Sequence, residues 1–208
     1  YTSFTQTMGS VSETGGTISF DVTVTNTGSV AGKDVVEVYF NPPYTDGGIE
    51  KATANLIAFE KTQLLQPGAS QIVSISFNLE DMAAFDTYGA GAYVLEAGDY
   101  IISINSNSHT PLESQVYNVP TNIIYGEGNA RSTDHVSALR SFDFVEGTDH
   151  VYLSRADGFA NYETATAVPA STEMSDEEKE GFTNNGNWTP TEDTAISMPV
   201  TGAKNGLT

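Results

Sequence analysis

Residues 17–26 have the sequence TISFDVTVTN, in which apolar and polar side chains alternate without a break. Ile18, Phe20, Val22 and Val24 fall on one side of an extended chain, and the polar residues between them fall on the other. This period of two predicts a β-strand with one buried and one solvated face. Because the apolar face has to be covered by a second sheet, the stretch predicts a layered β fold.

Similar alternating runs recur along the first part of the chain. They cover residues 36–40, 56–60, 73–79 and 100–104, the run at 56–60 being the least regular. Turn residues separate them at 14–16, 26–28, 67–68 and 97–99, where glycine supplies positive φ and proline presets the entry to the turn. Residues 80–85 contain helix formers and predict a helical turn between two strands. Together these features predict an all-β sandwich.

The composition limits the classes of function. The chain has 208 residues, with 27 acidic and 8 basic side chains and a net charge of −19. Phosphate binding needs clustered Lys and Arg, so this charge argues against nucleic acid and against anionic membrane surfaces as partners. No apolar run approaches the length of a membrane span, and the absence of Cys excludes disulfides and thiolate metal sites. The chain starts at Tyr1 without Met, and we expect it to be a piece of a longer polypeptide.

The pattern changes near residue 120. We expect a β-sandwich over residues 1–120 and an irregular C-terminal extension, with short helices and strands, over residues 121–208. Within the extension, residues 132–140 predict a short helix, and residues 142–144 and 151–153 predict one or two strands. Ser175 and Glu178 fit a capping box, and residues 182–208 have the Asn-, Thr-, Gly- and Pro-rich composition of a linker.

Candidate catalytic groups are weak in this sequence. Adjacent carboxylates occur at 80–81, 176–178 and 192–193, but neighbours in an extended chain point in opposite directions, so solvated surface charges are the better interpretation. An Asp-His dipeptide ends at His135 and another at His150; they lie fifteen residues apart without a third ligand, which argues against a metal site. We expect no metal and no cofactor.

Aromatic side chains are the other candidates for binding. Sugar rings stack on exposed aromatic faces, and the candidates for such a platform are Tyr39, Tyr44, Tyr88, Tyr93 and Trp188. Most of them occupy alternating positions or lie beside turns, so packing is the more frequent interpretation. A carbohydrate-binding or adhesin-type β-sandwich module therefore stays open as an alternative, as does a hidden enzyme that uses the Asp-His dipeptides.

Six segments resemble one known domain, in the same order along the chain. Residues 26–39 (NTGSVAGKDVVEVY) resemble the signature of the fibronectin type III-like domain of glycoside hydrolase family 3, the β-glucosidase family. The other segments that resemble this domain or the chain just before it are residues 1–4, 56–61, 64–68, 81–86 and 95–100. The resemblance implies an immunoglobulin-like sandwich over about the first 107 residues.

The resemblance can be narrowed to one branch of that family. Residues 42–51 and 152–157 look like the branch with permuted domain order, in which an α/β-sandwich domain comes first, the fibronectin-like domain second and a (β/α)₈-type barrel last. In the family, the nucleophile Asp lies on the barrel and the acid/base Glu on the α/β-sandwich domain. The resemblance therefore implies that no residue of this chain has a catalytic role.

Our interpretation is a non-catalytic spacer that braces the two catalytic domains of a retaining β-glucosidase-like parent, which hydrolyses terminal β-glycosides. Its partners would be the neighbouring domains of the same chain, with sugar contact only at the rim of the parent's pocket. Arg155, Asp157 and Trp188 are the expected interdomain contacts. The compartment stays open between bacterial cytoplasm and the extracellular space.

Overall fold

The computed structural model describes residues 1–134, 152–168, 173, 175–177 and 179. The chain forms two compact units, Tyr1–Ala165 and Thr166–Thr208. No helix in the described ranges is long and apolar enough to cross a membrane. The described residues of the first unit form eleven strands, one 3₁₀ helix (Leu79–Met82) and one short α-helix, α2 (Tyr162–Ala165).

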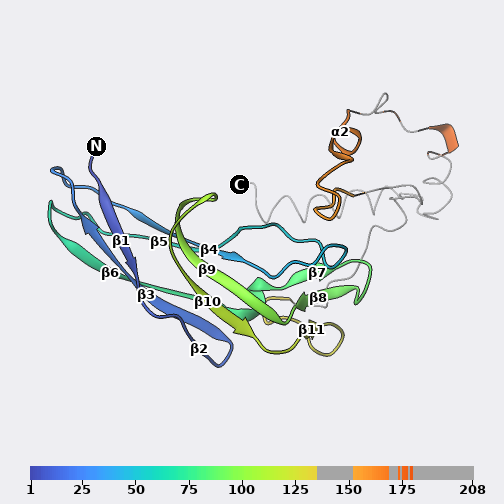
Figure 1. The fold of residues 1–208 in the computed structure, drawn as a ribbon, viewed down its shortest axis with the longest axis horizontal. Coiled ribbons are helices and arrows are strands. Elements are labelled where there is room, and N and C mark those ends of the chain that lie inside the picture. Colours follow the sequence, from blue (N-terminus) through green and yellow to red (C-terminus); the bar gives the residue numbers. More distant parts are fainter. Residues whose placement is uncertain (135–151, 169–172, 174, 178, 180–208) are drawn as a thin grey trace, which may run out of the picture. The chain divides into compact units, whose positions relative to one another are not determined.

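Two antiparallel sheets make up most of the first unit (Figure 1). One sheet contains β1 (Phe4–Met8), β2 (Ser12–Thr14), β3 (Thr17–Asn26) and β6 (Ser70–Asn78), with β3 in contact with the other three. The second has the order β10-β9-β4-β5, with bounds Thr110–Val119, Gly98–Asn107, Val35–Asn41 and Asn55–Lys61. A small third sheet, β11-β8-β7, comprises Ile123–Tyr125, Ala92–Leu95 and Ala84–Asp86.

The core lies between the two large sheets, as the alternation at residues 17–26 predicts. Ile18 pairs with Phe77, Phe20 with Ile75 and Val22 with Val73 across β3 and β6, and all six are buried. A shift of one residue in this register would turn the whole apolar set outward, so the alternation fixes the pairing. The opposite layer is formed by Val36, Val38 and Phe40 of β4 and by Tyr100, Ile102 and Ile104 of β9. The predicted β-sandwich is confirmed.

A buried amide closes the end of the sandwich where β3 finishes. Asn26 is fully buried, and its Nδ2 donates to the carbonyls of Val30 at 2.8 Å and Leu65 at 2.9 Å. Its Oδ1 accepts from Thr2 Oγ1 at 2.7 Å and from the Gly28 amide at 3.0 Å. A Cβ at Gly28 would lie 2.7 Å from the Ser3 nitrogen, so the close approach of these two segments requires glycine.

The predicted helical turn is present as a 3₁₀ turn, Leu79–Met82, but Phe85 belongs to β7. The alternation in the sequence does not predict β1, β2, β10 or the small third sheet. The expected boundary at residue 120 falls between β10 and β11, and β11 pairs with β8, so the described sheet structure continues past it.

Several expectations for the extension fall wholly or partly on residues outside the described ranges. These are the helix at 132–140, of which residues 132–134 form a turn, the strand at 142–144, the linker-like stretch at 182–208, and Glu178 of the capping box. The described Tyr152 and Leu153 belong to no strand. In the second unit, the Lys179 amide donates to the Ser175 carbonyl at 3.0 Å, which is one turn of helix.

Candidate functional site

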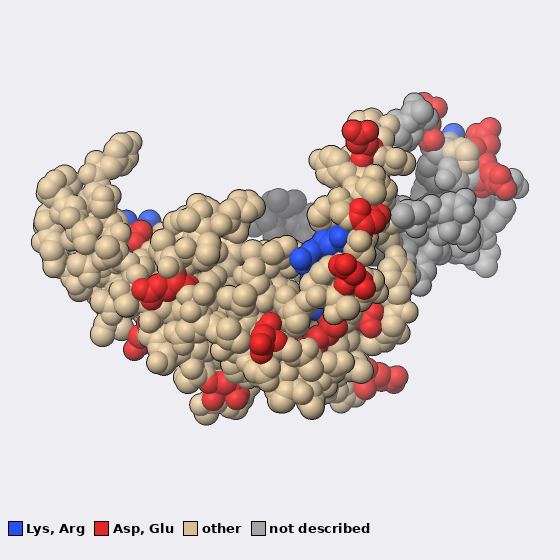
Figure 2. Space-filling view, in the orientation of Figure 1, with Lys and Arg blue, Asp and Glu red and all other residues tan. Residues whose placement is uncertain are grey.

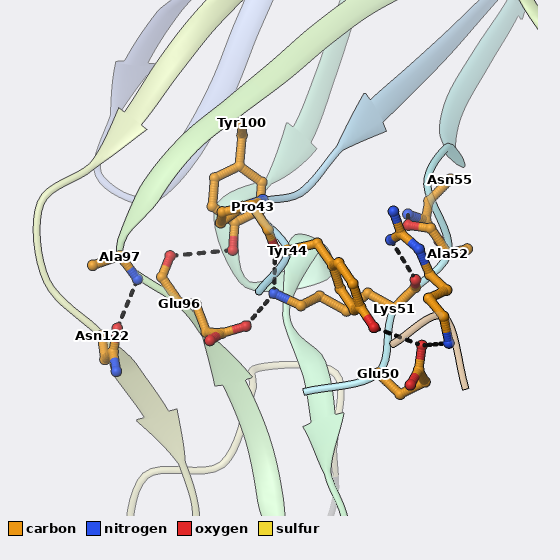
Figure 3. A network of polar contacts seen from close by, with 11 residues as sticks. Pro43, Tyr44, Glu50, Lys51, Ala52, Asn55, Glu96, Ala97, Tyr100 and Asn122 are labelled. Atoms are coloured by element: carbon orange, nitrogen blue, oxygen red, sulfur yellow. Dashed lines mark hydrogen bonds and ion pairs between the residues drawn. The ribbon is translucent and has the colours of Figure 1, made fainter. Parts of the chain in front are cut away.

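A buried lysine organises the loop that follows β4. Pro42 and Pro43 turn the chain away from the sheet, and the loop returns to it through Lys51, whose side chain is only 5% exposed. The Lys51 ammonium forms an ion pair with the Glu96 carboxylate and donates to the Pro43 carbonyl at 2.6 Å (Figure 3). A buried ammonium needs such partners, because without them its charge is strongly destabilising.

Glu96 connects this ion pair to the core. Its backbone carbonyl accepts a hydrogen bond from the Tyr100 hydroxyl at 3.2 Å, and the neighbouring Ala97 amide donates to Asn122 Oδ1 at 2.7 Å (Figure 3). Burial, together with the nearby Glu96 charge, raises the pKa of Tyr100 to about 12. The network therefore joins the loop after β4, the start of β9 and the chain after β10.

Arg155 adds a later segment to the same loop. Its guanidinium lies 3.9 Å above the centre of the Tyr44 ring, and its Nη1 donates to the Lys51 carbonyl at 2.8 Å. The backbone amide of Arg155 donates to Glu50 Oε1 at 3.0 Å. Burial is the main cause that raises the pKa of Tyr44, and the Glu50 charge adds to it. We call Tyr44, Glu50, Lys51 and Arg155 the Arg155 clamp.

The other two expected contact residues have different surroundings. Asp157 is exposed, and its Oδ1 accepts from the Ala160 amide at 3.2 Å, within the turn that precedes α2. Trp188 lies outside the described residues. The structure therefore brings Arg155 onto the sandwich and leaves Asp157 on the surface.

A second arginine makes a similar arrangement that the sequence did not indicate. The Arg131 guanidinium lies 3.5 Å above the centre of the Tyr93 ring and donates two hydrogen bonds to Asp134, at 2.9 and 3.0 Å. These bonds lower the pKa of the Asp134 carboxyl. Next to it, Glu80 accepts hydrogen bonds from the Ser132 amide, at 2.9 Å, and from the Ser132 hydroxyl. We call Tyr93, Arg131 and Asp134 the Arg131 clamp.

A groove of about 1280 Å³ lies beside the Arg155 clamp, within the first unit. Its walls include Glu50, Asp86, Tyr88, Glu96 and Tyr152. The Asp86 carboxylate accepts the amides of Gly89 at 2.9 Å and Ala90 at 2.7 Å, so it holds its own turn. Lys and Arg are few on the face drawn in Figure 2, where Asp and Glu are scattered over the surface.

The paired carboxylates Glu80 and Asp81 each accept backbone amides, from Ser132 and Asn78 respectively. Within the described ranges, no three His, Cys, Asp or Glu side chains are grouped so that they could hold a metal ion. Of the aromatic candidates, Tyr39 is buried and Tyr44 and Tyr93 stack on arginines, whereas Tyr88 is 77% exposed.

Residues 34–108 match the fibronectin type III-like domain family. Over 107 residues the chain is 40% identical to β-glucosidase A of Butyrivibrio fibrisolvens, a match that covers 50% of this chain and 13% of that protein. It is 39% identical over 94 residues to a β-glucosidase of Ruminococcus albus, covering 43% of this chain and 10% of that protein. The matches thus span only a small part of these relatives.

Among solved structures, the chain is again similar to β-glucosidases. β-Glucosidase 3B of Thermotoga neapolitana aligns with a TM-score of 0.54 and 33% identity, over 60% of this chain and 17% of that one. A β-glucosidase of Kluyveromyces marxianus aligns with a TM-score of 0.55 and 30% identity, over 60% of this chain and 15% of that one. The chain therefore carries a fibronectin type III-like β-sandwich domain and is similar, in that part, to β-glucosidases of glycoside hydrolase family 3.

Proposed function

We propose that this chain is a non-catalytic structural spacer that braces neighbouring domains of a β-glucosidase-like glycoside hydrolase. The support is threefold: the sandwich fold, the relatives that are β-glucosidases many times longer than the match, and the polar network around Lys51. Catalytic carboxylates have to be held within about half an ångström of their working positions. A sandwich with fixed loops can hold neighbouring domains that accurately, whereas a flexible linker cannot.

The Arg155 clamp is the observation that carries this proposal. It fastens a segment that follows the sandwich by about thirty residues to a loop that is itself held by the buried Lys51. Stacking of arginine on tyrosine, together with two hydrogen bonds, fixes direction as well as position. A chain that leaves the sandwich through residues 152–165 therefore leaves at a defined place.

The finer parts of the proposal concern the parent protein. It would be a retaining enzyme that hydrolyses terminal β-glycosides, with an α/β-sandwich domain before this chain and a barrel after it. Asp157, which is exposed, and Trp188 would contact those domains, and the groove beside Glu50 would lie at the rim of the parent's sugar pocket.

Apolar side chains on the outer face of the second sheet also suit a neighbouring domain. Leu56 and Phe59 of β5, Ile101 of β9 and Val116 of β10 are between 44% and 69% exposed. Val116 pairs directly with Ile101, so these two form a continuous apolar surface. Apolar surface of this kind is typical of a face that is covered in the complete protein.

The test compares aryl-β-glucoside hydrolysis by this chain and by the same chain extended through both neighbouring domains. We expect turnover only by the extended protein. In that protein, Arg155→Ala should lower kcat, while Arg155→Lys, which keeps the charge but not the planar stack, should give an intermediate value. Turnover by the 208-residue chain alone, abolished by an acid-to-amide substitution within it, would contradict the proposal.

A further inference from the structure

A second, smaller pocket lies at the end of the sandwich where β4 begins. Its volume is about 390 Å³, within the range that small-molecule sites occupy. Gln6 of β1, Val35 of β4 and Asn105 of β9 contribute to its walls, together with Lys33 and Lys61. The groove beside the Arg155 clamp follows the other end of β4, so the two sites are separate.

Two residues in the walls of this pocket carry an amide oxygen that has no hydrogen-bond partner among the described residues: Gln6 Oε1 and Asn105 Oδ1, both covered by the surrounding protein. The orientation of Gln6 is fixed, because its Nε2 donates to Asp34 Oδ2 at 2.9 Å and to the Val35 carbonyl at 3.0 Å. Asn105 is only 4% exposed. Buried acceptors without donors are destabilising, and two in the walls of one small pocket indicate a ligand that carries N–H or O–H groups.

The charges around the pocket decide between a cation and a neutral ligand. Lys33 and Lys61 face it together with Asp34 and Glu37, so the formal charges cancel. Neither ammonium forms an ion pair with any residue that the structure describes. Asp34 and Glu37 already accept hydrogen bonds from Gln6 and Tyr39. The two amide oxygens without donors and the two ammonium groups without ion pairs suit a neutral molecule that both donates and accepts hydrogen bonds.

Apolar side chains complete the walls. Phe4 and Leu112 line the pocket, and Leu112 is 47% exposed. A ring with hydroxyl groups at its edge and C–H groups on its face matches this combination of amide oxygens, ammonium groups and apolar walls. We propose that this pocket binds one neutral sugar unit, with its hydroxyls donating to Gln6 Oε1 and Asn105 Oδ1 and accepting from Lys33 or Lys61.

The ladder between β9 and β10 is irregular beside one wall of the pocket. The ladder between β9 and β10 shifts register at Pro111, which pairs with Asn105, and proline has no amide hydrogen to donate. Because the two amide oxygens are covered, we expect sugar binding to displace side chains around them, beside the irregular ladder at Pro111. The backbone amides of residues 105–112 would report the displacement.

The experiment is a titration of the ¹⁵N-labelled 208-residue chain with methyl β-D-glucopyranoside, followed by amide chemical shifts. We expect saturable shifts at residues 4–6, 33–37 and 105–112, with a Kd on the order of 1–10 mM, as suits a ligand of this size. Asn105→Leu should weaken binding by about tenfold or more, because one buried hydrogen bond is lost. The matched control is Asn118→Leu on β10, outside the pocket, where Asn118 donates to Asp99 at 2.7 Å and binding should not change.

Three results would overturn the proposal. The first is the absence of saturation up to about 100 mM sugar, a level well above the expected Kd. The second is saturation that Asn105→Leu leaves unchanged. The third is tighter, Asn105-dependent binding of methylguanidinium, which would assign the pocket to an arginine side chain of a partner. None of these bears on the spacer proposal, whose test measures hydrolysis.

Discussion

Polar side chains are buried at both ends of β4, but the two ends differ in whether these side chains have hydrogen-bond partners. Beyond Asn41, every group named in the network is matched: Lys51 has Glu96 and the Pro43 carbonyl, and Arg155 has Tyr44, Glu50 and the Lys51 carbonyl. At the Val35 end, by contrast, Gln6 Oε1 and Asn105 Oδ1 lack donors among the described residues. Hydrogen-bonded polar groups stabilise the segments that they join. Buried acceptors without donors are destabilising unless a ligand supplies the donors.

Of the substitutions at the two ends of β4, the one with the largest effect should be that of Lys51. Lys51→Met leaves the Glu96 carboxylate, 29% exposed, without its ammonium and leaves the Pro43 carbonyl without a donor. We expect the free energy of unfolding to fall by about 2–3 kcal/mol, because a largely buried pair loses one partner. Urea denaturation followed by circular dichroism measures it.

Lys61→Met, at the other end, is the matched control for that prediction. Lys61 is exposed and forms no ion pair with a described residue, so the change should stay within about 0.5 kcal/mol. Equal effects of the two substitutions would remove the contrast between the ends.

The next effect is on the pH dependence of stability. The pKa of Tyr100 is raised to about 12 by burial and by Glu96, while an unfolded tyrosine titrates near 10. Unfolding above pH 10 therefore releases a proton, so this stabilisation is complete below pH 10 and is lost as the pH rises toward 12, by up to about 2–3 kcal/mol. Tyr100→Phe should make this decline shallower in urea titrations at pH 9, 10 and 11. Tyr88→Phe, at a position 77% exposed, should leave the slope as it is.

Arg155→Ala should have a smaller effect, confined to the segment that the clamp holds. Loss of the stack on Tyr44 and of the bond to the Lys51 carbonyl should lower stability by about 1 kcal/mol. Limited chymotrypsin digestion should then cut faster at Tyr152, Phe159 or Tyr162. If Arg131→Ala accelerates the same cuts equally, the Arg155 clamp has no special hold on that segment.

The smallest effect is expected at the unmatched end. Asn105→Leu removes an acceptor that has no donor, so stability should change by no more than about 0.5 kcal/mol, in either direction. Asn26→Leu is the contrasting substitution, since that buried amide makes four hydrogen bonds and its loss should cost about 2–4 kcal/mol. Thermal denaturation of both variants measures which of the two substitutions lowers stability more. A large loss for Asn105→Leu would mean that its amide is matched after all.

The sequence predicts those strands whose two faces differ. β3 and β6 alternate cleanly because one face is buried and the other is not. In β9 the apolar residues alternate with polar ones, although Ser103 and Asn105 are buried as well. β5 is an edge strand with an irregular register opposite Val38 and Tyr39, and its alternation is correspondingly less regular. The sequence pattern does not predict β10 because seven of its ten residues are exposed, so its pairing with β9 leaves only a weak apolar signal.

The site was predictable only in part. Residues 42–51 and 152–157 both stand out through their resemblance to one family branch, and the structure brings them together at Lys51 and Arg155, 104 residues apart. Neither segment alone predicts that the two are in contact, because a contact between residues so far apart in the sequence depends on how the chain between them folds. Arg131 itself matches no motif. The sequence marks its partners Tyr93 and Asp134 only as a candidate for sugar stacking and as part of an Asp-His dipeptide, and nothing links either of them to Arg131. The Asp157 carboxylate accepts the Ala160 amide in a local turn, and its expected interdomain contact stays a prediction.

The hydrogen bonds that close the sandwich also set an order of events during synthesis. The Met8 amide donates to Glu113, 105 residues later, and Gln115 donates to the Gly9 carbonyl, 106 residues earlier. At translation rates of about 5–20 residues per second, the β1 side of each pair waits roughly 5–20 seconds for its partner. Contacts that close such long loops form late and slow the folding of the domain. A strand translated early is thus among the last to be fully hydrogen-bonded, which makes the nascent sandwich dependent on β10.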